Sequence, residues 1–374
     1  MFQFRKVLQH TCPLYVALFI TACTLQNKET VLFYNPATLS FPTNQPASAS
    51  PAQTHHIDTL NIHDPAILPD PKSQTYYVYA SYSPKRKKQA LRSPNNRAGV
   101  KAYWSKDLQT WHGPKLVYEV GANFWASKTD GPWAPEVNYY NGKYYLFATF
   151  NDWDQIIDQR PNRPKITKRA AQILVAESPL GPFEPFANQP HTPSGEMTLD
   201  GTIWVEDGEP WLVYCQEWVQ VANGLIKAIK LTPDLSTTQG EPITLISAAD
   251  VAWTRRTINY RGNPTPGAVT DGPFLYRTRS GSLLLLWSSW THKRHYATSL
   301  AYSHNGKLAG PWTHRKEPIL WDDRGHGNIF RTFDGKLRLA VHRYFKQPNT
   351  RLQIWQLEDT GSDLKLGAQL YGHK

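Results

Sequence analysis

Cysteine, methionine and charged side chains are scarce in this sequence, and no long segment shows the 3.6-residue periodicity of an amphipathic helix. Among 374 residues there are three Cys and two Met, and charged residues make up 19%. Three cysteines are too few for a disulfide-stapled fold. Low charge beside 40% hydrophobic residues excludes a disordered chain. The length fits one large domain or two.

The N-terminus has the features of an export signal. Arg5 and Lys6 precede the apolar stretch CPLYVALFI, which is too short to span a bilayer comfortably. The stretch ends in ITAC, which resembles the bacterial lipobox and implies that Cys23 becomes the lipidated first residue of the mature chain. An ordinary secretory peptide is the alternative. We expect a signal peptide at 1–22, a flexible tether at 23–56, and a protein of the periplasm or outer membrane that contacts the membrane through its lipid only.

The cysteines predict neither a disulfide nor a metal site. Cys12 lies in the predicted signal and Cys23 is predicted to be acylated, so Cys215 has no intramolecular partner. Cys215 lies in an apolar run, where a single Cys is more often a small core residue than a nucleophile. No helical Cys/His metal spacing occurs in the sequence.

The net charge is +11, and the run PKRKKQALR at 84–92 supplies part of it. Nucleic-acid binding is one interpretation of such a run. The run is short, and no nucleic-acid-binding motif accompanies it, so we interpret it as a solvated loop and predict no nucleic-acid partner.

Short strand-like runs rich in aromatic and β-branched residues fill the chain from residue 57 onward, separated by turn pairs such as NG, DG and SG. Five of these units begin with a polar or acidic residue, a tight turn and then a more apolar strand. Five units of four strands predict an all-β domain at 57–374, a five-bladed β-propeller. Two stacked β-sandwiches are the alternative, which the lack of a visible linker disfavours. The residues that open the five units are Asp64, Glu136, Asp200, Asp271 and His326.

In a propeller the first strand of each blade lines the central channel, so residues that open these strands converge at one mouth. We therefore expect Asp64, Asp200 and Asp271 to meet. The chain also has 14 Trp, 19 Tyr and 14 Phe, which supply flat apolar surfaces for sugar rings as well as core packing. Carboxylates in an aromatic-lined cleft are typical of glycoside hydrolysis, in which one activates water and another protonates the leaving oxygen.

Five motifs, HDPAI, WAPEV, LDGTIWVEDG, DGPFLYR and GHGNIF, resemble in this order the blade-opening motifs of glycoside hydrolase family 43, over roughly residues 57–355. The resemblance implies an inverting glycosidase on a five-bladed propeller. It gives Asp64 the role of general base, and Asp200 the role of tuning and orienting the acid. The family usually has the general acid as Glu in an EGP motif, whereas this chain has Asp271 in DGP, whose side chain is roughly 1.5 Å shorter.

The departure at DGP leaves two candidates for the general acid. Asp271 occupies the position of the family's acid. Glu217, in VYCQEWVQV, follows the second strand of the unit that Asp200 opens, and an antiparallel strand returns its end to the same mouth. A structural ion pair is the other interpretation of Glu217.

Further residues are expected around the substrate, each of which has a structural alternative such as core packing or a surface salt bridge. Near His326 the resemblance implies a place for a structural Ca²⁺, while inversion by carboxylates requires no cofactor. The predicted substrate-binding residues are Trp133, Glu136, Trp218, Trp290, Arg343 and His326.

The predicted function is that of a monomeric α-L-arabinofuranosidase that acts on an oligosaccharide or polysaccharide. A β-xylosidase or a galactan-directed glycosidase is the next hypothesis. A propeller that binds glycan without cleaving it is the alternative from another class, and the departure at DGP keeps it open.

Overall fold

The computed structural model describes residues 53–85, 93–260 and 262–373. The predicted signal peptide, Cys23, nearly all of the predicted tether and most of the basic run lie outside these residues. Strands dominate the described part, with a single α-helix, α1 (Trp218–Val221), and two 3₁₀ turns, η1 (Ile57–Thr59) and η2 (Ala248–Asp250). None of its helices is long and apolar enough to cross a membrane.

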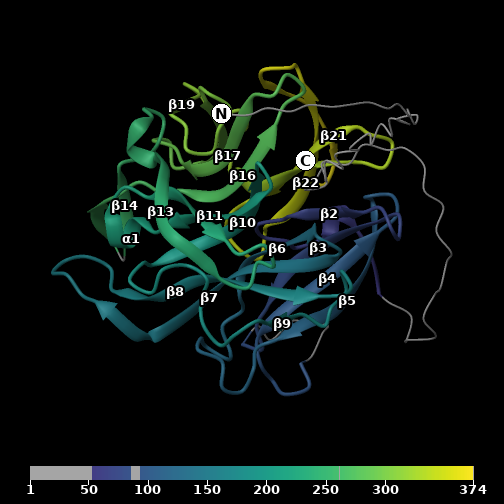
Figure 1. Ribbon diagram of the computed structural model, residues 1–374, viewed down its shortest axis with the longest axis horizontal. Coiled ribbons are helices and arrows are strands. Elements are labelled where there is room, and N and C mark those ends of the chain that lie inside the picture. The colour runs from purple at the N-terminus through teal and green to yellow at the C-terminus, as the bar shows by residue number, and fades with distance from the viewer. Residues whose placement is uncertain (1–52, 86–92, 261, 374) are drawn as a thin grey trace, which may run out of the picture.

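Five antiparallel sheets account for nearly all of the strands, and each is formed by consecutive strands that run from the channel outward (Figure 1). Blade 1 has β2 (Ile67–Asp70), β3 (Thr75–Tyr82), β4 (Gly99–Ser105) and β5 (Thr110–Glu119), with β1 (Thr54–His56) outside β5. Blade 2 has β6 (Trp133–Tyr140), β7 (Lys143–Asp158), β8 (Ile166–Ala176) and β9 (Glu184–Pro185). Blade 3 has β10 (Thr198–Glu206), β11 (Glu209–Gln216), β12 (Leu225–Leu231) and β13 (Thr238–Ser247). Blade 4 has β16 (Asp271–Arg277), β17 (Leu283–Trp290), β18 (Tyr296–Ser303) and β19 (Trp312–His314). Blade 5 has β20 (Arg324–Arg331), β21 (Leu337–Arg343), β22 (Arg351–Asp359) and β23 (Leu364–Tyr371).

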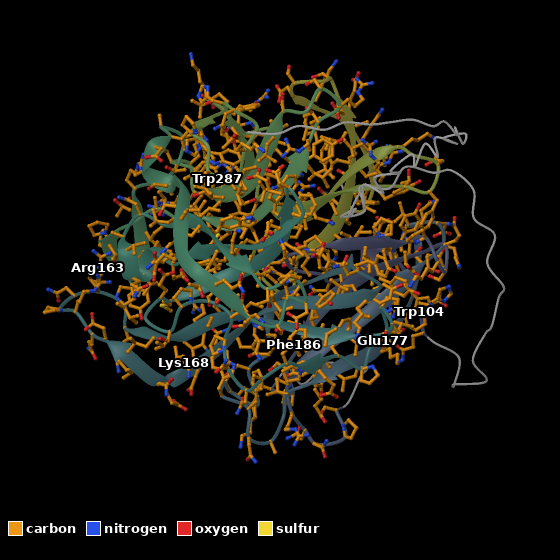
Figure 2. The ribbon with its side chains drawn as sticks, viewed as in Figure 1. Trp104, Arg163, Lys168, Glu177, Phe186 and Trp287 are labelled. Carbon is orange, nitrogen blue, oxygen red and sulfur yellow. The ribbon has the colours of Figure 1, made fainter. Side chains whose placement is uncertain are left out.

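Hydrophobic packing between neighbouring blades closes the ring. Separate buried clusters join blades 1 and 2, 2 and 3, 3 and 4, 4 and 5, and 5 and 1. Trp287, labelled in Figure 2, is fully buried in the cluster between blades 3 and 4. At the closing seam, the Asn328 side chain of blade 5 accepts from the backbone N–H of Ile67 and donates to its carbonyl, each at 2.9 Å. The five-bladed propeller predicted from the sequence is confirmed, and the two-sandwich alternative is excluded.

The ordered domain begins earlier than the predicted boundary at residue 57. Strand β1 lies inside the predicted tether and pairs with β5, with Thr54 opposite His112. Its sequence, THH, has no apolar residue, and it is held at the sheet edge by backbone pairing. A strand of this kind carries no hydrophobic alternation, so the sequence pattern did not indicate it.

One side of the propeller is built up by additional structure. The hairpin of β7 and β8 is long and projects from blade 2, on the left of Figure 1. Its tip is tied to the neighbouring elements, because Arg160 donates to the carbonyl of Val219 in α1 and Arg163 to the carbonyl of Pro266. Pro266 ends the small hairpin of β14 (Thr257–Tyr260) and β15 (Asn263–Pro266). Figure 2 shows Arg163 at this outer edge.

Candidate active site

The innermost strands of all five blades share a left-handed residue where they reach the channel mouth. These residues are Asp64, Ala134, Asp200, Gly272 and His326, with φ between 42° and 57°. All five line one small cavity of about 10 Å³ on the axis. Other residues of the chain also have positive φ, but these five occupy equivalent places in the five blades and meet at one cavity, so they mark the end of the channel where the acids converge.

Two of the five residues predicted to open the blades, Asp271 and Glu136, do not occupy the left-handed position. A β-bulge interrupts the pairing of β16 just after Asp271, so Gly272, and not Asp271, is the counterpart of Asp64 and Asp200. In blade 2 the bulge between Trp133 and Glu136 likewise makes Ala134 the counterpart. Bulges add a residue without a change in sequence pattern, so spacing from the turn did not reveal them.

The bulges place the acids at different depths. Asp64 and Asp200 line both the small axial cavity and the large cleft above it. Asp271 lines only the large cleft, and Glu136 lines only the small cavity, where it accepts from the side chains of Thr202 and Asn138. Asp64, Asp200 and Asp271 therefore converge as predicted, whereas Glu136 lies deeper than a residue of the substrate cleft.

The large cleft has a volume of about 1060 Å³ and contains most of the predicted binding residues. Arg343 does not line it; its guanidinium stacks 4.7 Å from the ring of Tyr344 instead. The preceding residue, His342, is the one that points to the site, because side chains alternate along a strand. The predicted residues that line the cleft are Trp133, Trp218, Trp290, Glu217 and His326.

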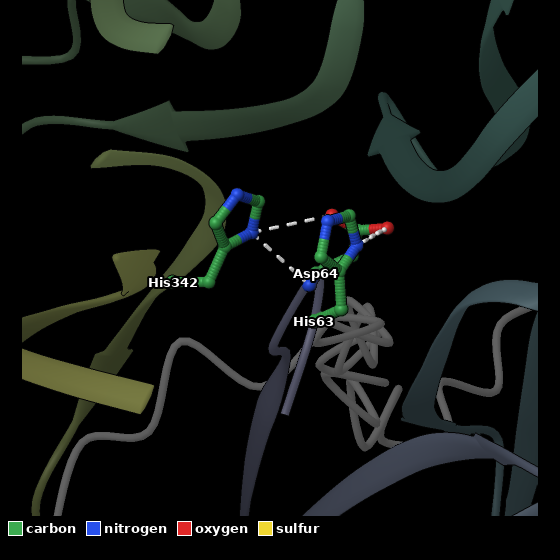
Figure 3. A group of neighbouring side chains, drawn as sticks. All are labelled: His63, Asp64 and His342. Atoms are coloured by element: carbon green, nitrogen blue, oxygen red, sulfur yellow. Dashed lines mark hydrogen bonds and ion pairs between the residues drawn. The ribbon is translucent and has the colours of Figure 1, made fainter. Parts of the chain in front are cut away.

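Three imidazoles surround the carboxylate of Asp64. The Nδ1 atoms of His63, His326 and His342 lie 2.8, 3.2 and 3.3 Å from its oxygens, and Figure 3 shows the first and last of these. Burial alone would raise the pKa of Asp64, but the charges of His326 and His63 hold it well below its usual range. Asp64 is therefore an ionised carboxylate in a buried place, which is the state that a general base needs.

Two of these imidazoles, His63 and His342, differ in their hydrogen bonds and in the direction of their pKa shifts. His63 directs Nδ1 at Asp64 and Nε2 at the carbonyl of Phe345, 3.0 Å away, so both nitrogens face oxygens and the ring is best satisfied as a cation. Burial alone would lower its pKa, but the charge of Asp64 and the hydrogen bonds to Asp64 and to the carbonyl of Phe345 together raise it. His342 instead accepts the backbone N–H of Asp64 at 3.2 Å, and burial lowers its pKa to about 4, so it is neutral.

His63, Asp64 and His342 also form a group with the spacing of metal ligands (Figure 3). The arrangement does not fit Ca²⁺, which takes six to eight oxygen ligands, because two of the three donors are imidazole nitrogens. The facing nitrogens are also already in use, toward Asp64 and its backbone N–H. We therefore assign no catalytic role to a metal here, and the Ca²⁺ expected near His326 stays a prediction.

Asp200 and Asp271 have the opposite electrostatics to Asp64. Asp200 is buried and accepts the backbone N–H of Gly272 at 3.0 Å; burial and then the charge of Asp64 raise its pKa well above the usual range. Burial and then the charge of Asp200 likewise raise the pKa of Asp271. The raised pKa favours the protonated form of Asp271, which is the form that a general acid needs.

Tyr296 holds Asp271 in place, and no signal in the sequence pointed to it. Its hydroxyl donates to Oδ2 of Asp271 at 2.8 Å, and its ring stacks on His342 with the centroids 5.4 Å apart and the planes 5° apart. If Oδ2 accepts from Tyr296, the acidic proton of Asp271 belongs on Oδ1. The ring of His342 also stacks on that of His63, with the centroids 4.3 Å apart.

Glu217 forms a buried ion pair with Arg169. Arg169 is fixed in turn by Asn151, to which its Nε donates at 2.6 Å, and its guanidinium lies 4.2 Å from the ring of Trp133. The carboxylate of Glu217 is thus already bound to a fixed guanidinium in the cleft wall. The geometry therefore favours Asp271 over Glu217 as the acid, and places Glu217 as a fixed acceptor in the cleft wall.

Comparison with known proteins agrees with this geometry. The sequence profile of Glycosyl hydrolases family 43 matches residues 57–359. The endo-arabinase of Bacteroides thetaiotaomicron VPI-5482 has a similar structure, with a TM-score of 0.70 and 34% identity over 83% of this chain and 98% of that one. An extracellular endo-α-(1→5)-L-arabinanase of Bacillus subtilis is 21% identical over 74% of this chain and 76% of its own. The α-L-arabinofuranosidase of Lactobacillus brevis shares the fold, with a TM-score of 0.62 and 17% identity over 84% and 96% of the two chains.

Proposed function

The chain belongs to glycosyl hydrolases family 43, a family of glycosidases, and from this premise we propose that it cleaves α-L-arabinofuranosyl linkages in arabinan. One observation carries the mechanism: two carboxyl groups that line one cleft have pKa values shifted in opposite directions, downward for Asp64 and upward for Asp271. Pairs of this kind divide base and acid work between them. The 34%-identical endo-arabinase supports the substrate.

In the proposed reaction Asp64 takes a proton from a water molecule as the water oxygen attacks the anomeric carbon. Asp271 gives its proton to the glycosidic oxygen, and the bond from that oxygen to the anomeric carbon breaks. His326 and His63 lower the pKa of Asp64 before the step, and burial together with the neighbouring Asp200 raises the pKa of Asp271. Solvent then restores both groups, and the sugar is released with inverted configuration.

The cleft favours a polymer over a single terminal sugar. Besides the acids at the axis, its lining includes residues of β3, β4, β5 and β1, so it extends across blade 1 to the outer edge of the sheet. We therefore propose action on internal linkages, in place of the arabinofuranosidase activity expected from the sequence. The non-catalytic glycan-binding alternative is not retained, since the family consists of glycosidases.

The test is hydrolysis of linear 1,5-arabinan, xylan and galactan by the purified chain, with chromatography of the products. We expect arabino-oligosaccharides of mixed length from arabinan, and NMR of the first-formed reducing ends should show inversion. Asp64→Asn is the control, with a loss of about 10²–10⁴-fold. Faster cleavage of xylan or galactan would refute the substrate, release of arabinose alone would refute internal cleavage, and retention would refute the mechanism.

A further inference from the structure

The part of the cleft that lies over blade 1 differs in charge from the part at the axis. We call it the blade-1 arm and define it by His55, Asn61, Lys101 and Tyr103, together with Arg351, which opens β22 of the adjacent blade 5. It crosses β3, β4, β5 and β1 in turn. Since neighbouring strands lie about 4.8 Å apart, the arm extends about 19 Å from the innermost strand, which exceeds the length of one sugar ring.

All carboxylates that line the cleft lie at its axial end, and they are Asp64, Asp200, Glu217 and Asp271. Among the described residues the blade-1 arm has no lining Asp or Glu, but it has the cations Lys101 and Arg351. The arm therefore presents positive charge to a ligand, whereas at the axial end the cations Arg169 and His63 are already paired with Glu217 and Asp64.

Arg351 is held in position by the chain itself. Its Nη1 donates to the carbonyls of Pro348 at 2.9 Å and Thr350 at 2.8 Å, which leaves Nη2 and Nε for a ligand. In the described part of the chain Arg351 has no ion pair with a carboxylate. Lys101 lies on the same arm, with its Nζ 5.7 Å from the centre of the Tyr103 ring, so a cation and an aromatic face stand side by side.

Neutral arabinan presents hydroxyl groups, and no cation is required to bind it. A planar guanidinium that is positioned by backbone carbonyls matches a carboxylate, which it binds through two parallel hydrogen bonds. We propose that the blade-1 arm binds a hexuronic acid residue of the glycan, several units from the bond that is cleaved. The substrate class is then an arabinan attached to, or substituted with, acidic sugar. This inference rests on the proposed function for the position of the cleaved bond.

The experiment measures binding without turnover, by calorimetry of the full chain carrying Asp64→Asn. The probes are a galacturonic acid oligosaccharide and its fully methyl-esterified form, which has the same shape without the charge. We expect the acid form to bind at least threefold more tightly, with the difference shrinking as salt rises. Lys101→Gln and Arg351→Gln should each weaken the acid form about two- to fivefold, the range for partly exposed ion pairs.

Lys365→Gln, on the exposed outer strand of blade 5, is the matched control, and it should leave the affinity for the acid form unchanged. If the chain without substitutions in the arm binds the acid and ester forms equally tightly, the inference is wrong, regardless of the results with the variants. Weakening by Lys365→Gln to the same extent as by Arg351→Gln would overturn it as well, since net charge alone would then explain the binding. Failure to cleave arabinan would refute the proposed function separately, because these affinities do not depend on turnover.

Discussion

Tyr296→Phe removes one hydroxyl from the site and tests the assignment of Asp271 as the acid. The lost hydrogen bond stabilises the charged form of Asp271, so its removal should raise the pKa of Asp271 further. Hydrogen bonds to charged groups contribute about 1.5–3 kcal/mol, and about 1.4 kcal/mol corresponds to one pH unit. A general acid is active while protonated and is lost as pH rises through its pKa. The alkaline limb of the pH profile should therefore move up by about 1–2 pH units.

The same substitution should lower kcat at the optimum by about 10–100-fold on arabino-oligosaccharides, since Asp271 becomes a less stabilised anion when it gives up its proton. Tyr302→Phe is the matched control: it changes the same strand, but its hydroxyl contacts Asp363 and Arg315, away from the cleft. The assay is the pH dependence of kcat/KM for both variants. An alkaline limb that stays in place or moves down in Tyr296→Phe would show that Asp271 is not the acid.

Four further substitutions test other parts of the protein. Asp271→Ala should spare substrates with a nitrophenolate leaving group and slow arabino-oligosaccharides by at least 10²-fold, whereas Glu217→Gln should slow both alike; the opposite pattern in parallel rate measurements would make Glu217 the acid. Arg169→Met leaves the buried carboxylate of Glu217 unpaired and should lower the free energy of unfolding by about 3–5 kcal/mol, measured by urea denaturation; a loss below about 1 kcal/mol would mean that the pair is well solvated. We also propose that Cys23 is the lipid anchor, so Cys23→Ala should move the protein from the membrane fraction to the soluble fraction or stall its processing, and unchanged fractionation would contradict the lipobox interpretation.

The sequence predicted the propeller and the convergence of its acids because both follow from local patterns. Strand runs, turn pairs and the acids Asp64 and Asp200 repeat along the chain, and the family motifs order them. The partners of the acids come from other strands: His342 of β21 for Asp64, Tyr296 of β18 for Asp271, and Arg169 of β8 for Glu217. A buried Tyr or His in the middle of a strand looks like any core residue, so its role appears only when the ring closes. His63 was adjacent to Asp64 throughout, but adjacency alone did not show that its ring turns back to the carboxylate.

The ring of left-handed residues has a consequence for engineering. Each blade presents one interchangeable position to the axis, and this chain fills three of them with functional side chains and two with Ala134 and Gly272. Gly272 cannot accept a graft, because a Cβ there would lie 2.7 Å from the ring of His326. Ala134 already has a Cβ in the same backbone conformation. New chemistry, such as a third axial carboxylate or a metal ligand, can therefore be introduced from blade 2 without remodelling the scaffold.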